Sequence, residues 1–525
     1  CTYSDTCSCP GDKFIAFFNK IKIRPDGFWQ YVIMALCGAI AAFGFAPFNL
    51  WWATLIAIGV AYYLMTRGYK KYSVFGAWLR AAPFGAAYAI AMFWWVINSI
   101  YVVPELAAQF AIWTIPALIG IGLVGAIIFS IPFVVVMCVR TVPACRAILF
   151  AAVWTLVLWL REWVFTGFPW NPIANITMPF PELANSMSVW GALGLSFIIV
   201  GFIVSVVDVI ARRGKMCWFP FIIFLSLLIC GGFIGYKNIK YSQCDGENYG
   251  PVIRIVQPAR SASQKATHSR SDAIRNANEN VRAMIALATA PGAPDLIVFP
   301  ETSYPFVITD GDNMPIAHIL KSDILIGATT YSDGLMYNSL ISALPSGQIN
   351  HIYSKSHLVP FGEYRPFGDI IPTPGQLTPG TGPEIMTING FNFAPAICYE
   401  IVFSDSLIPV NENPNAIVNI TNDTWFGTTP GTYQHLDMVR RYAIESGVPI
   451  VRANYSGISA FVNSDGEISS FIPVGVSGYA DGTVCGAHLT AYRAIGRDGW
   501  MIIILLFSCI CVMFLNYRCE ENKPL

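Results

Sequence analysis

The sequence is short of charged residues. Only 12% of its 525 residues are Asp, Glu, Lys or Arg, against about 25% in an average soluble domain. The formal net charge at pH 7 is zero, so the chain has no overall basic field, which excludes binding to nucleic acid through bulk electrostatics. Hydrophobic residues make up 54% of the chain and the mean hydropathy is +0.52. This composition predicts a protein with a large membrane-embedded part.

Cysteine is present, but not in the spacings that chemistry with metals requires. None of the fourteen cysteines belongs to a paired CxxC motif or to a Cys/His ligand pattern, which argues against a zinc site. Cys244 and Cys485 flank the polar middle part of the chain and are able to pair if that part faces an oxidising compartment. We expect Cys398 to stay free.

Eight apolar runs have close to the ~20 residues that cross a bilayer as a helix. Trp and Tyr lie at their boundaries, as they do at membrane interfaces, and only residues 47–49 separate the first two runs. The predicted spans are residues 29–46, 50–66, 73–97, 111–139, 147–165, 188–210, 217–236 and 500–517. At the end of the fifth span, Arg161 and Glu162 are expected to reach the membrane interface by snorkelling; the alternative is that they pair or serve function at membrane depth.

Lys and Arg are enriched in every second connection between the spans, which predicts that both termini lie inside. The large polar part of the chain then lies outside. The predicted organisation is an N-terminal inside segment, a seven-helix transmembrane domain, a large outside domain, an eighth transmembrane helix and an inside tail, at residues 1–28, 29–236, 237–499, 500–517 and 518–525.

The polar part alternates short apolar strands with helical segments, a pattern typical of an α/β domain. Helices are predicted at residues 270–290 and 432–447. The long loops at residues 303–322 and 362–385 are predicted lids. Strands are predicted at residues 252–257, 296–299, 324–328, 337–344, 391–397, 416–419, 450–453 and 460–462.

Three side chains in this part form a possible catalytic set. Cys398 directly follows an apolar strand, Glu301 follows another, and Lys355 begins a loop. A cysteine attacks as the thiolate, which a cation or a base promotes. Taken singly, each residue has a more ordinary explanation, as a packed cysteine, a solvated carboxylate or a surface lysine. The order Glu, Lys, Cys nevertheless predicts an acid/base, a cation and a nucleophile.

The motifs around these residues resemble those of the nitrilase superfamily. They are Pro300-Glu301, Lys355 with Leu358-Val359-Pro360-Phe361-Gly362-Glu363, and Ile397-Cys398-Tyr399-Glu400. Two further stretches, together with the plan of seven spans, polar domain and eighth span, resemble the apolipoprotein N-acyltransferase family. These stretches are Thr166-Gly167-Phe168-Pro169-Trp170, and Asn419-Ile420-Thr421-Asn422-Asp423-Thr424-Trp425-Phe426-Gly427 with Gln434-His435. The resemblance covers about residues 28–517.

The resemblance implies a polytopic helical membrane domain that carries an extracytoplasmic nitrilase-like αββα sandwich. It implies transfer of a fatty acyl chain from a phospholipid, through a cysteine thioester, to the N-terminal amine of an S-diacylglyceryl-cysteine apolipoprotein. Glu301, Lys355 and Cys398 would be catalytic, and no metal or diffusible cofactor is implied. Supporting roles fall to Glu363, Tyr399, Glu400, Asn338 and Pro366, and contacts with substrate or lipid to Gly167, Trp170, Trp425 and Phe426.

The resemblance further implies a monomer in a bacterial inner membrane, with the catalytic domain on the periplasmic side. One stretch departs from the family pattern, because residues 257–266, which end at Gln264-Lys265-Ala266, contain no tryptophan. The alternative from a different reaction class is a membrane-tethered amidase of the nitrilase type that uses water as the acceptor. A transporter or scaffold is a third possibility, disfavoured because Glu301, Lys355 and Cys398 are all present.

Overall fold

The computed structural model places apolar helices at all eight predicted spans. It describes residues 27–67, 72–102, 104–139, 141–211, 214–242, 250–260, 270–366, 368, 376–403 and 407–521. Within these ranges, six helical stretches are long and apolar enough to cross a membrane, and two more, Phe28–Gly44 and Trp51–Thr66, are shorter. The prediction of about eight apolar helices is therefore confirmed in position, although by length only six qualify as spans.

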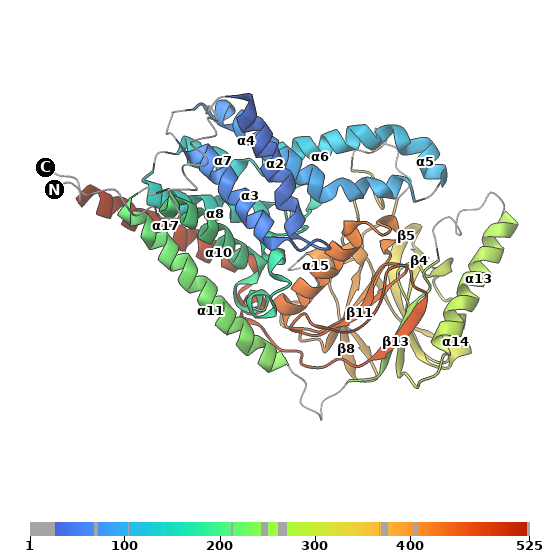
Figure 1. Cartoon of the computed structure of the whole chain (residues 1–525). Helices are drawn as coiled ribbons and strands as arrows, with labels where there is room; N and C mark the ends of the chain where they lie inside the picture. The colour runs from blue at the N-terminus through green and yellow to red at the C-terminus, as the bar shows by residue number, and fades with distance from the viewer. Residues whose placement is uncertain are drawn as a thin grey trace, which may run out of the picture.

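The helices of the membrane part pack side by side around one buried apolar core. The long ones are α2 (Phe28–Ala41), α3 (Trp51–Thr66), α4 (Val74–Phe93), α6 (Thr114–Ile128), α7 (Ile131–Cys138), α8 (Pro143–Leu160), α10 (Met187–Ile210), α11 (Trp218–Ser242) and α17 (Arg497–Glu521). Short segments join them: η1 (Ala42–Gly44), η2 (Trp94–Ile100), α5 (Pro104–Phe110), η3 (Ala111–Trp113), η4 (Val164–Thr166), η5 (Ile173–Thr177), α9 (Pro181–Ala184), η6 (Lys215–Cys217) and α16 (Ala491–Ile495). Figure 1 shows α17 returning beside α8 and α10 after the second domain.

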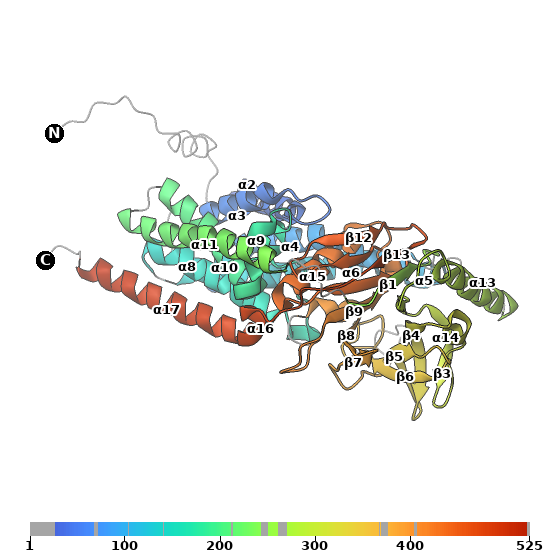
Figure 2. The same cartoon turned by 90° about the horizontal axis from the view of Figure 1, so that it is seen from below.

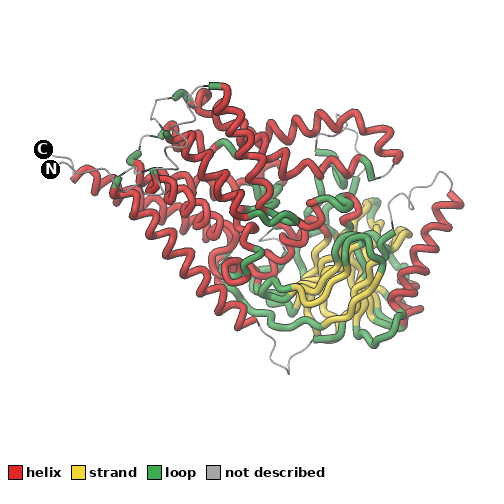
Figure 3. The backbone as a smooth tube through the Cα atoms, viewed as in Figure 1, coloured by secondary structure: helices red, strands yellow, loops and turns green. Residues whose placement is uncertain are grey.

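The second domain contains two β-sheets. The seven-stranded sheet has the order β13-β1-β2-β4-β5-β6 with β3 paired to β4, and the six-stranded sheet has the order β12-β11-β10-β9-β8-β7. Their strands are β1 (Ile253–Gln257), β2 (Leu296–Val298), β3 (Tyr304–Thr309), β4 (Asp323–Ser332), β5 (Leu335–Ala343), β6 (Ile349–Ser354), β7 (Met386–Ile388), β8 (Phe391–Ile397), β9 (Ala416–Thr421), β10 (Ile450–Asn454), β11 (Ser459–Val462), β12 (Ile468–Ile472) and β13 (Gly478–Gly482). Figure 3 shows these strands gathered in one part of the molecule.

The two sheets pack face to face and helices cover their outer faces. Alternate side chains of both sheets, such as Val298 and Ile420, form the core between them, because successive residues of a strand point to opposite faces. Helices α13 (Arg270–Ala288) and α14 (Pro315–Leu320) pack on the outer face of the first sheet. Helix α15 (Pro430–Ser446) covers the second sheet. The predicted αββα sandwich is therefore confirmed.

Helix α15 also forms a large part of the contact between the two domains. Its buried side chains belong to the same apolar core as the membrane helices, and Figures 1 and 2 show it between the second sheet and the helical bundle, with α13 on the opposite side of the sandwich. Helix α15 is therefore one layer through which the second domain is seated on the bundle.

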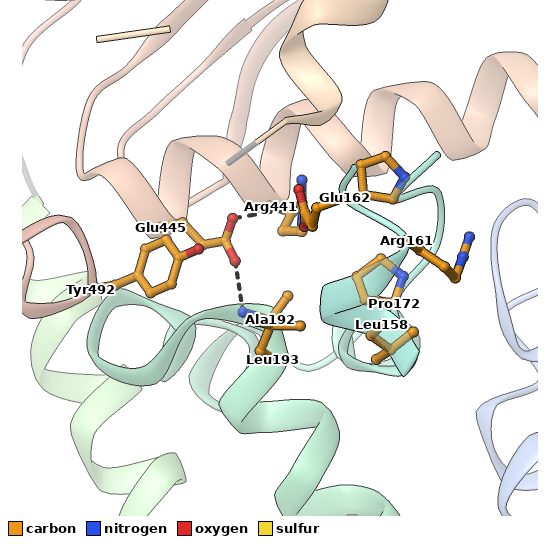
Figure 4. Close-up of a pocket in the computed structure, with 10 residues that line it drawn as sticks. Leu158, Arg161, Glu162, Pro172, Ala192, Leu193, Arg441, Glu445 and Tyr492 are labelled. Atoms are coloured by element: carbon orange, nitrogen blue, oxygen red, sulfur yellow. Dashed lines mark hydrogen bonds and ion pairs between the residues drawn. The ribbon is translucent and has the colours of Figure 1, made fainter. Parts of the chain in front are cut away.

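A charged junction fixes this contact. Helix α10 is broken at Gly191, where φ is +63°, so the N–H of Ala192 begins a new helical segment and lacks an acceptor within the helix. The Glu445 carboxylate of α15 accepts this hydrogen bond at 2.6 Å and lies 3.7 Å from Arg441. Figure 4 shows Glu445 pointing toward both partners across a small cavity. A helix N-terminus favours such a carboxylate.

Of two predictions on interfaces and loops, one is wrong. Arg161 and Glu162, just beyond the end of α8 at Leu160, are both buried in the protein, and their position relative to the membrane interface stays a prediction. Arg161 donates to the carbonyls of Phe168 and Trp170, and Glu162 lies 3.5 Å from Arg497. Residues 303–322 are not a long loop, since they form β3 and α14.

Candidate active site

Glu301, Lys355 and Cys398 meet at the ends of three strands. Cys398 follows β8 of one sheet, whereas Glu301 and Lys355 follow β2 and β6 of the other. Because the two sheets pack face to face, their strand ends deliver these side chains to one place from opposite sides. Glu301 and Lys355 are 6% and 1% exposed. Side chains on rigid strand ends are held more precisely than side chains on loops.

Lys355 is clamped between two carboxylates. Its Nζ lies 2.9 and 2.8 Å from the two carboxylate oxygens of Glu363 and 3.7 Å from Oε1 of Glu301. Burial disfavours the ammonium group, but Glu363 and Glu301 outweigh this effect and raise the pKa of Lys355. The lysine is therefore a permanent cation in the site.

The two carboxylates have different electrostatic environments. Burial raises the pKa of Glu301, and the Glu363 carboxylate raises it further. For Glu363, burial is outweighed by Lys355 and by the N–H of Val359, which lies 2.7 Å from Oε2, so its pKa is lowered. Glu363 is thus a fixed anion, whereas Glu301 is suited to gain and lose a proton.

Cys398 is held at a tight backbone turn. Its φ of +53° lies in the left-handed region, which a residue other than glycine adopts at a cost of about 1–3 kcal/mol. Burial raises the pKa of its thiol, and the Glu301 carboxylate raises it further. The resting nucleophile is therefore a neutral thiol beside the Glu301 carboxylate.

Glu400 holds the nucleophile loop against the lysine loop. Its Oε1 accepts hydrogen bonds from the Tyr353 hydroxyl (2.9 Å), the Ser356 N–H (2.7 Å) and hydroxyl (2.8 Å), and the His357 N–H (3.1 Å). Its Oε2 accepts from the N–H of Ile397 at 2.8 Å. One buried carboxylate thus joins the residues on both sides of Lys355 to the residue before Cys398.

The other predicted supporting residues lie in different places. Asn338 of β5 donates to Glu301 at 2.7 Å and to Glu363 at 2.9 Å, and its carbonyl accepts from the N–H of Lys355. Tyr399 is buried and its hydroxyl donates to the Gly167 carbonyl at 2.8 Å. Pro366 is exposed. Its role in the cleft stays a prediction.

The predicted substrate contacts divide into two groups. Trp425 is 42% exposed, and Phe426 is half-buried beside it. We expected Trp170 to face lipid, but it is only 1% exposed and does not. Its Nε1 donates a hydrogen bond to Gln434 of α15, and its ring stacks on the ring of Phe168. Gly167 is also buried. These two residues belong to the contact between the domains, and their binding of substrate stays a prediction.

A second buried polar cluster lies behind the nucleophile, and the sequence analysis predicted no role for its residues. Asp423 accepts hydrogen bonds from His435 (2.8 Å), Arg452 (2.7 Å) and Asn454 (2.7 Å). Because the Asp423 carboxylate only accepts, the His435 proton lies on Nδ1. Burial lowers the pKa of His435. Asp423 and His435 stand in the motif stretch, but Arg452 of β10 carries no signal in the sequence.

The Asp423→Asn substitution is expected to cost stability that depends on pH. Burial opposes ionisation of Asp423, but His435 and Arg452 lower its pKa to about 2, below the value of about 4 in an unfolded chain. The stabilisation is therefore present above pH ~4 and is lost as the pH falls through about 2. We expect the difference in unfolding free energy between wild type and variant to fall from roughly 2–3 kcal/mol at pH 5 toward zero at pH 2.

Denaturant unfolding in detergent at a series of pH values measures this difference. Asp333→Asn is the matched control, because Asp333 is exposed in the turn between β4 and β5. A difference for Asp423→Asn that does not change with pH would contradict the assignment of Asp423 as the buried anion.

Some predictions fall outside the described residues. Cys244 and Lys265 lie there, as does most of the predicted N-terminal segment. Cys485 is disulfide-bonded. The second predicted lid, residues 362–385, is described only in part.

Comparison with known proteins agrees with this architecture. Residues 37–205 match the family described as the apolipoprotein N-acyltransferase N-terminal domain, and residues 255–494 match the carbon-nitrogen hydrolase family. The chain is 31% identical to an apolipoprotein N-acyltransferase of Allorhizobium ampelinum, over 94% of this chain and 98% of that protein. The chain belongs to the apolipoprotein N-acyltransferase family. A second member, from Rhizobium leguminosarum bv. trifolii, is 32% identical over 91% of this chain and 95% of its own length.

The family assignment confirms the resemblance read from the motifs. The matched membrane segment contains the loop with Trp170, and the matched hydrolase segment contains Glu301, Lys355 and Cys398. Among solved structures, a CN-hydrolase superfamily protein from Xanthomonas campestris aligns with 49% of this chain and 97% of its own, at 20% identity and a TM-score of 0.36.

Proposed function

We propose that this bacterial membrane protein transfers a fatty acyl chain from a phospholipid to the N-terminal amine of an S-diacylglyceryl-cysteine apolipoprotein. One observation carries the proposal: Glu301, Lys355 and Cys398 converge in a buried cluster whose neighbours are bonded to the membrane domain. A hydrolase of small soluble amides has no need of this contact. The names of the relatives point to the same reaction.

In the first half-reaction, Glu301 takes the thiol proton of Cys398, and the sulfur attacks the ester carbonyl carbon of the phospholipid. Lys355 stabilises the negative oxygen that forms. The ester C–O bond then breaks, the proton on Glu301 passes to the oxygen of the departing lysophospholipid, and an S-acyl thioester remains on Cys398. The raised pKa of Glu301 suits this shuttle.

In the second half-reaction, the amine of the apolipoprotein attacks the thioester carbonyl. Glu301 removes a proton from the amine, the C–S bond breaks, and the sulfur leaves as a thiol when that proton returns to it. The product is an N-acylated lipoprotein. The reaction requires that an amine and not water reaches the thioester, which the burial of the cluster favours.

We further propose a monomer in the inner membrane, with the catalytic domain, residues 237–499, on the periplasmic side and both termini in the cytoplasm. The alternation of Lys and Arg between connections supports this orientation. The disulfide at Cys485 also supports it, since disulfides persist in oxidising compartments.

Intact mass of the purified protein tests the reaction. After incubation with phospholipid and no acceptor, we expect wild type to gain the mass of one fatty acyl chain and Cys398→Ala to gain none. A diacylglyceryl-cysteine peptide should discharge the adduct. An adduct that water discharges equally fast would favour the tethered amidase, and the absence of an adduct on folded wild type would contradict the proposal.

A further inference from the structure

One segment of the membrane domain is bonded to both catalytic loops. This segment, residues 163–168, leaves the end of α8 and is called the strap here. The Thr166 carbonyl accepts a hydrogen bond from His357 Nε2 at 2.9 Å, and the Gly167 carbonyl accepts one from the Tyr399 hydroxyl at 2.8 Å. His357 stands two residues beyond Lys355, and Tyr399 directly follows Cys398. The strap therefore joins the loop that carries Lys355 to the loop that carries Cys398.

The strap is held in a conformation that its own sequence does not favour. The φ angles of Phe165, Thr166 and Gly167 are +56°, +75° and +91°. For Phe165 and Thr166 this conformation costs about 1–3 kcal/mol each and persists only where the surroundings enforce it, whereas Gly167 adopts it freely. Arg161 supplies part of this restraint, because its guanidinium donates to the Phe168 carbonyl at 2.9 Å and its own carbonyl accepts from the Phe168 N–H.

His357 is fixed on its other sides as well. Its ring packs on Phe403, with centroids 3.8 Å apart, and lies 5.8 Å from the ring of Tyr399. Because a carbonyl only accepts, the His357 proton on Nε2 is committed to Thr166. Burial lowers the pKa of His357, although the Thr166 carbonyl and Glu363 oppose this effect and Lys355 adds to it. The neutral ring thus makes this bond, and Nε2 is not available as a base for the reaction.

We propose that His357 is a positioning residue, which through its bond to the strap holds the Lys355 loop in register with the Cys398 loop. The inference rests on the proposed function, which assigns the chemistry to Glu301, Lys355 and Cys398. It adds that the membrane domain is part of the active-site framework and not only an anchor. Loss of the His357 bond frees the lysine loop to move, and displacement of a reacting group by about 1 Å can cost 10²-fold in rate.

Two substitutions of His357 separate its hydrogen bond from its packing. His357→Leu keeps an apolar group over Phe403 but removes the donor, whereas His357→Gln keeps an N–H that reaches Thr166. The measurement is the single-turnover rate of thioester formation on Cys398 with phospholipid, followed by intact mass, beside the melting temperature of each variant. We expect His357→Leu to be ~10–100-fold slower than wild type and His357→Gln to return to within ~5-fold, with little change in melting temperature.

A second histidine provides the control. His351 of β6 lies 2.9 Å from Glu384 and away from the strap, so His351→Leu should form the thioester at the wild-type rate. Gly167→Ala provides a test of the pathway, because its new Cβ would lie 2.2 Å from the Glu162 carbonyl oxygen and displace the strap. In a protein that already carries Gly167→Ala, His357→Leu should slow thioester formation little further, since the effects of coupled residues are not additive.

The outcomes distinguish the inference from the function on which it rests. A wild-type protein that forms no thioester overturns both. Wild-type acylation with an equally fast His357→Leu overturns the inference alone. The inference is also overturned if His357→Gln forms the thioester as slowly as His357→Leu and both variants have the same lowered melting temperature. That result would assign His357 a role in packing. If the effects of Gly167→Ala and His357→Leu on the rate of thioester formation are fully additive, the proposed role of the strap is overturned.

Discussion

Replacement of Lys355 by methionine is expected to slow thioester formation on Cys398 by at least ~10³-fold. Methionine has a similar length and fills the same buried space, but it offers no cation to the developing oxyanion, and the loss of one such group costs about 10²–10³-fold. The substitution also leaves Glu301 and Glu363 buried beside each other without the ammonium that lies 3.7 and 2.8 Å from them. The first effect destabilises the oxyanion, and the second raises the pKa of Glu301, which favours a protonated Glu301 that cannot act as the base.

The same single-turnover mass measurement checks this expectation. Lys237→Met, which removes an exposed lysine near the end of α11, is the control and should acylate at the wild-type rate. The double variant Lys355→Met/Glu363→Gln removes one of the two stranded carboxylates, so it should regain stability and stay inactive. A Lys355→Met variant that folds and acylates within ~10-fold of wild type would show that the lysine is structural.

Replacement of Glu400 by alanine is expected to have the largest effect on stability. The substitution leaves the donors of Tyr353, Ser356, His357 and Ile397 without an acceptor in a site that is only 1% exposed. Each buried donor without a partner costs about 1–3 kcal/mol. Relaxation around the cavity recovers part of this cost, so we expect a loss of roughly 3–5 kcal/mol in the free energy of unfolding.

Denaturant unfolding in detergent measures this loss, with Glu412→Ala as the control because Glu412 is an exposed glutamate on a loop. Glu400→Gln should lie between the two, since its amide oxygen can still accept the bonds made to Oε1, whereas its amide nitrogen would face the N–H of Ile397. A loss below ~1 kcal/mol for Glu400→Ala would contradict the view that this carboxylate joins the two loops.

The sequence predicted strands best where they are buried on both faces. Strand β8 was predicted at residues 391–397 and lies at Phe391–Ile397, since a continuous apolar run bounded by turn residues is a strong signal. Strands β3, β6, β7, β12 and β13 were missed. In β12 half-buried and exposed residues alternate and only the last residue is buried, and β13 contains two glycines, one alanine and one aspartate in five positions. Such short edge strands owe their pairing to the neighbouring strand and not to their own composition.

The residues of the candidate site were found from motifs, but their physical states were not. Glu301 and Glu363 look alike in the sequence, yet only the packing around Lys355 makes one a proton carrier and the other a fixed anion. Likewise, Trp170 appeared to be an interfacial tryptophan. Its burial depends on Gln434, which lies far along the chain on α15.

The sequence by itself determined the membrane helices, the α/β class of the polar domain and the order Glu301, Lys355, Cys398, because hydrophobic runs, strand patterns and contiguous motifs are local, whereas the αββα sandwich was implied by the family resemblance. Only the tertiary structure decided that the Glu400 carboxylate joins the two catalytic loops and that the strap bonds His357 and Tyr399. Each of these contacts has a backbone group as one partner, which every residue possesses, so no pattern of side chains records which groups meet. The Glu400 contacts depend on the packing of the two sheets, and the strap contacts depend on the seating of the sandwich on the bundle, to which α15 contributes.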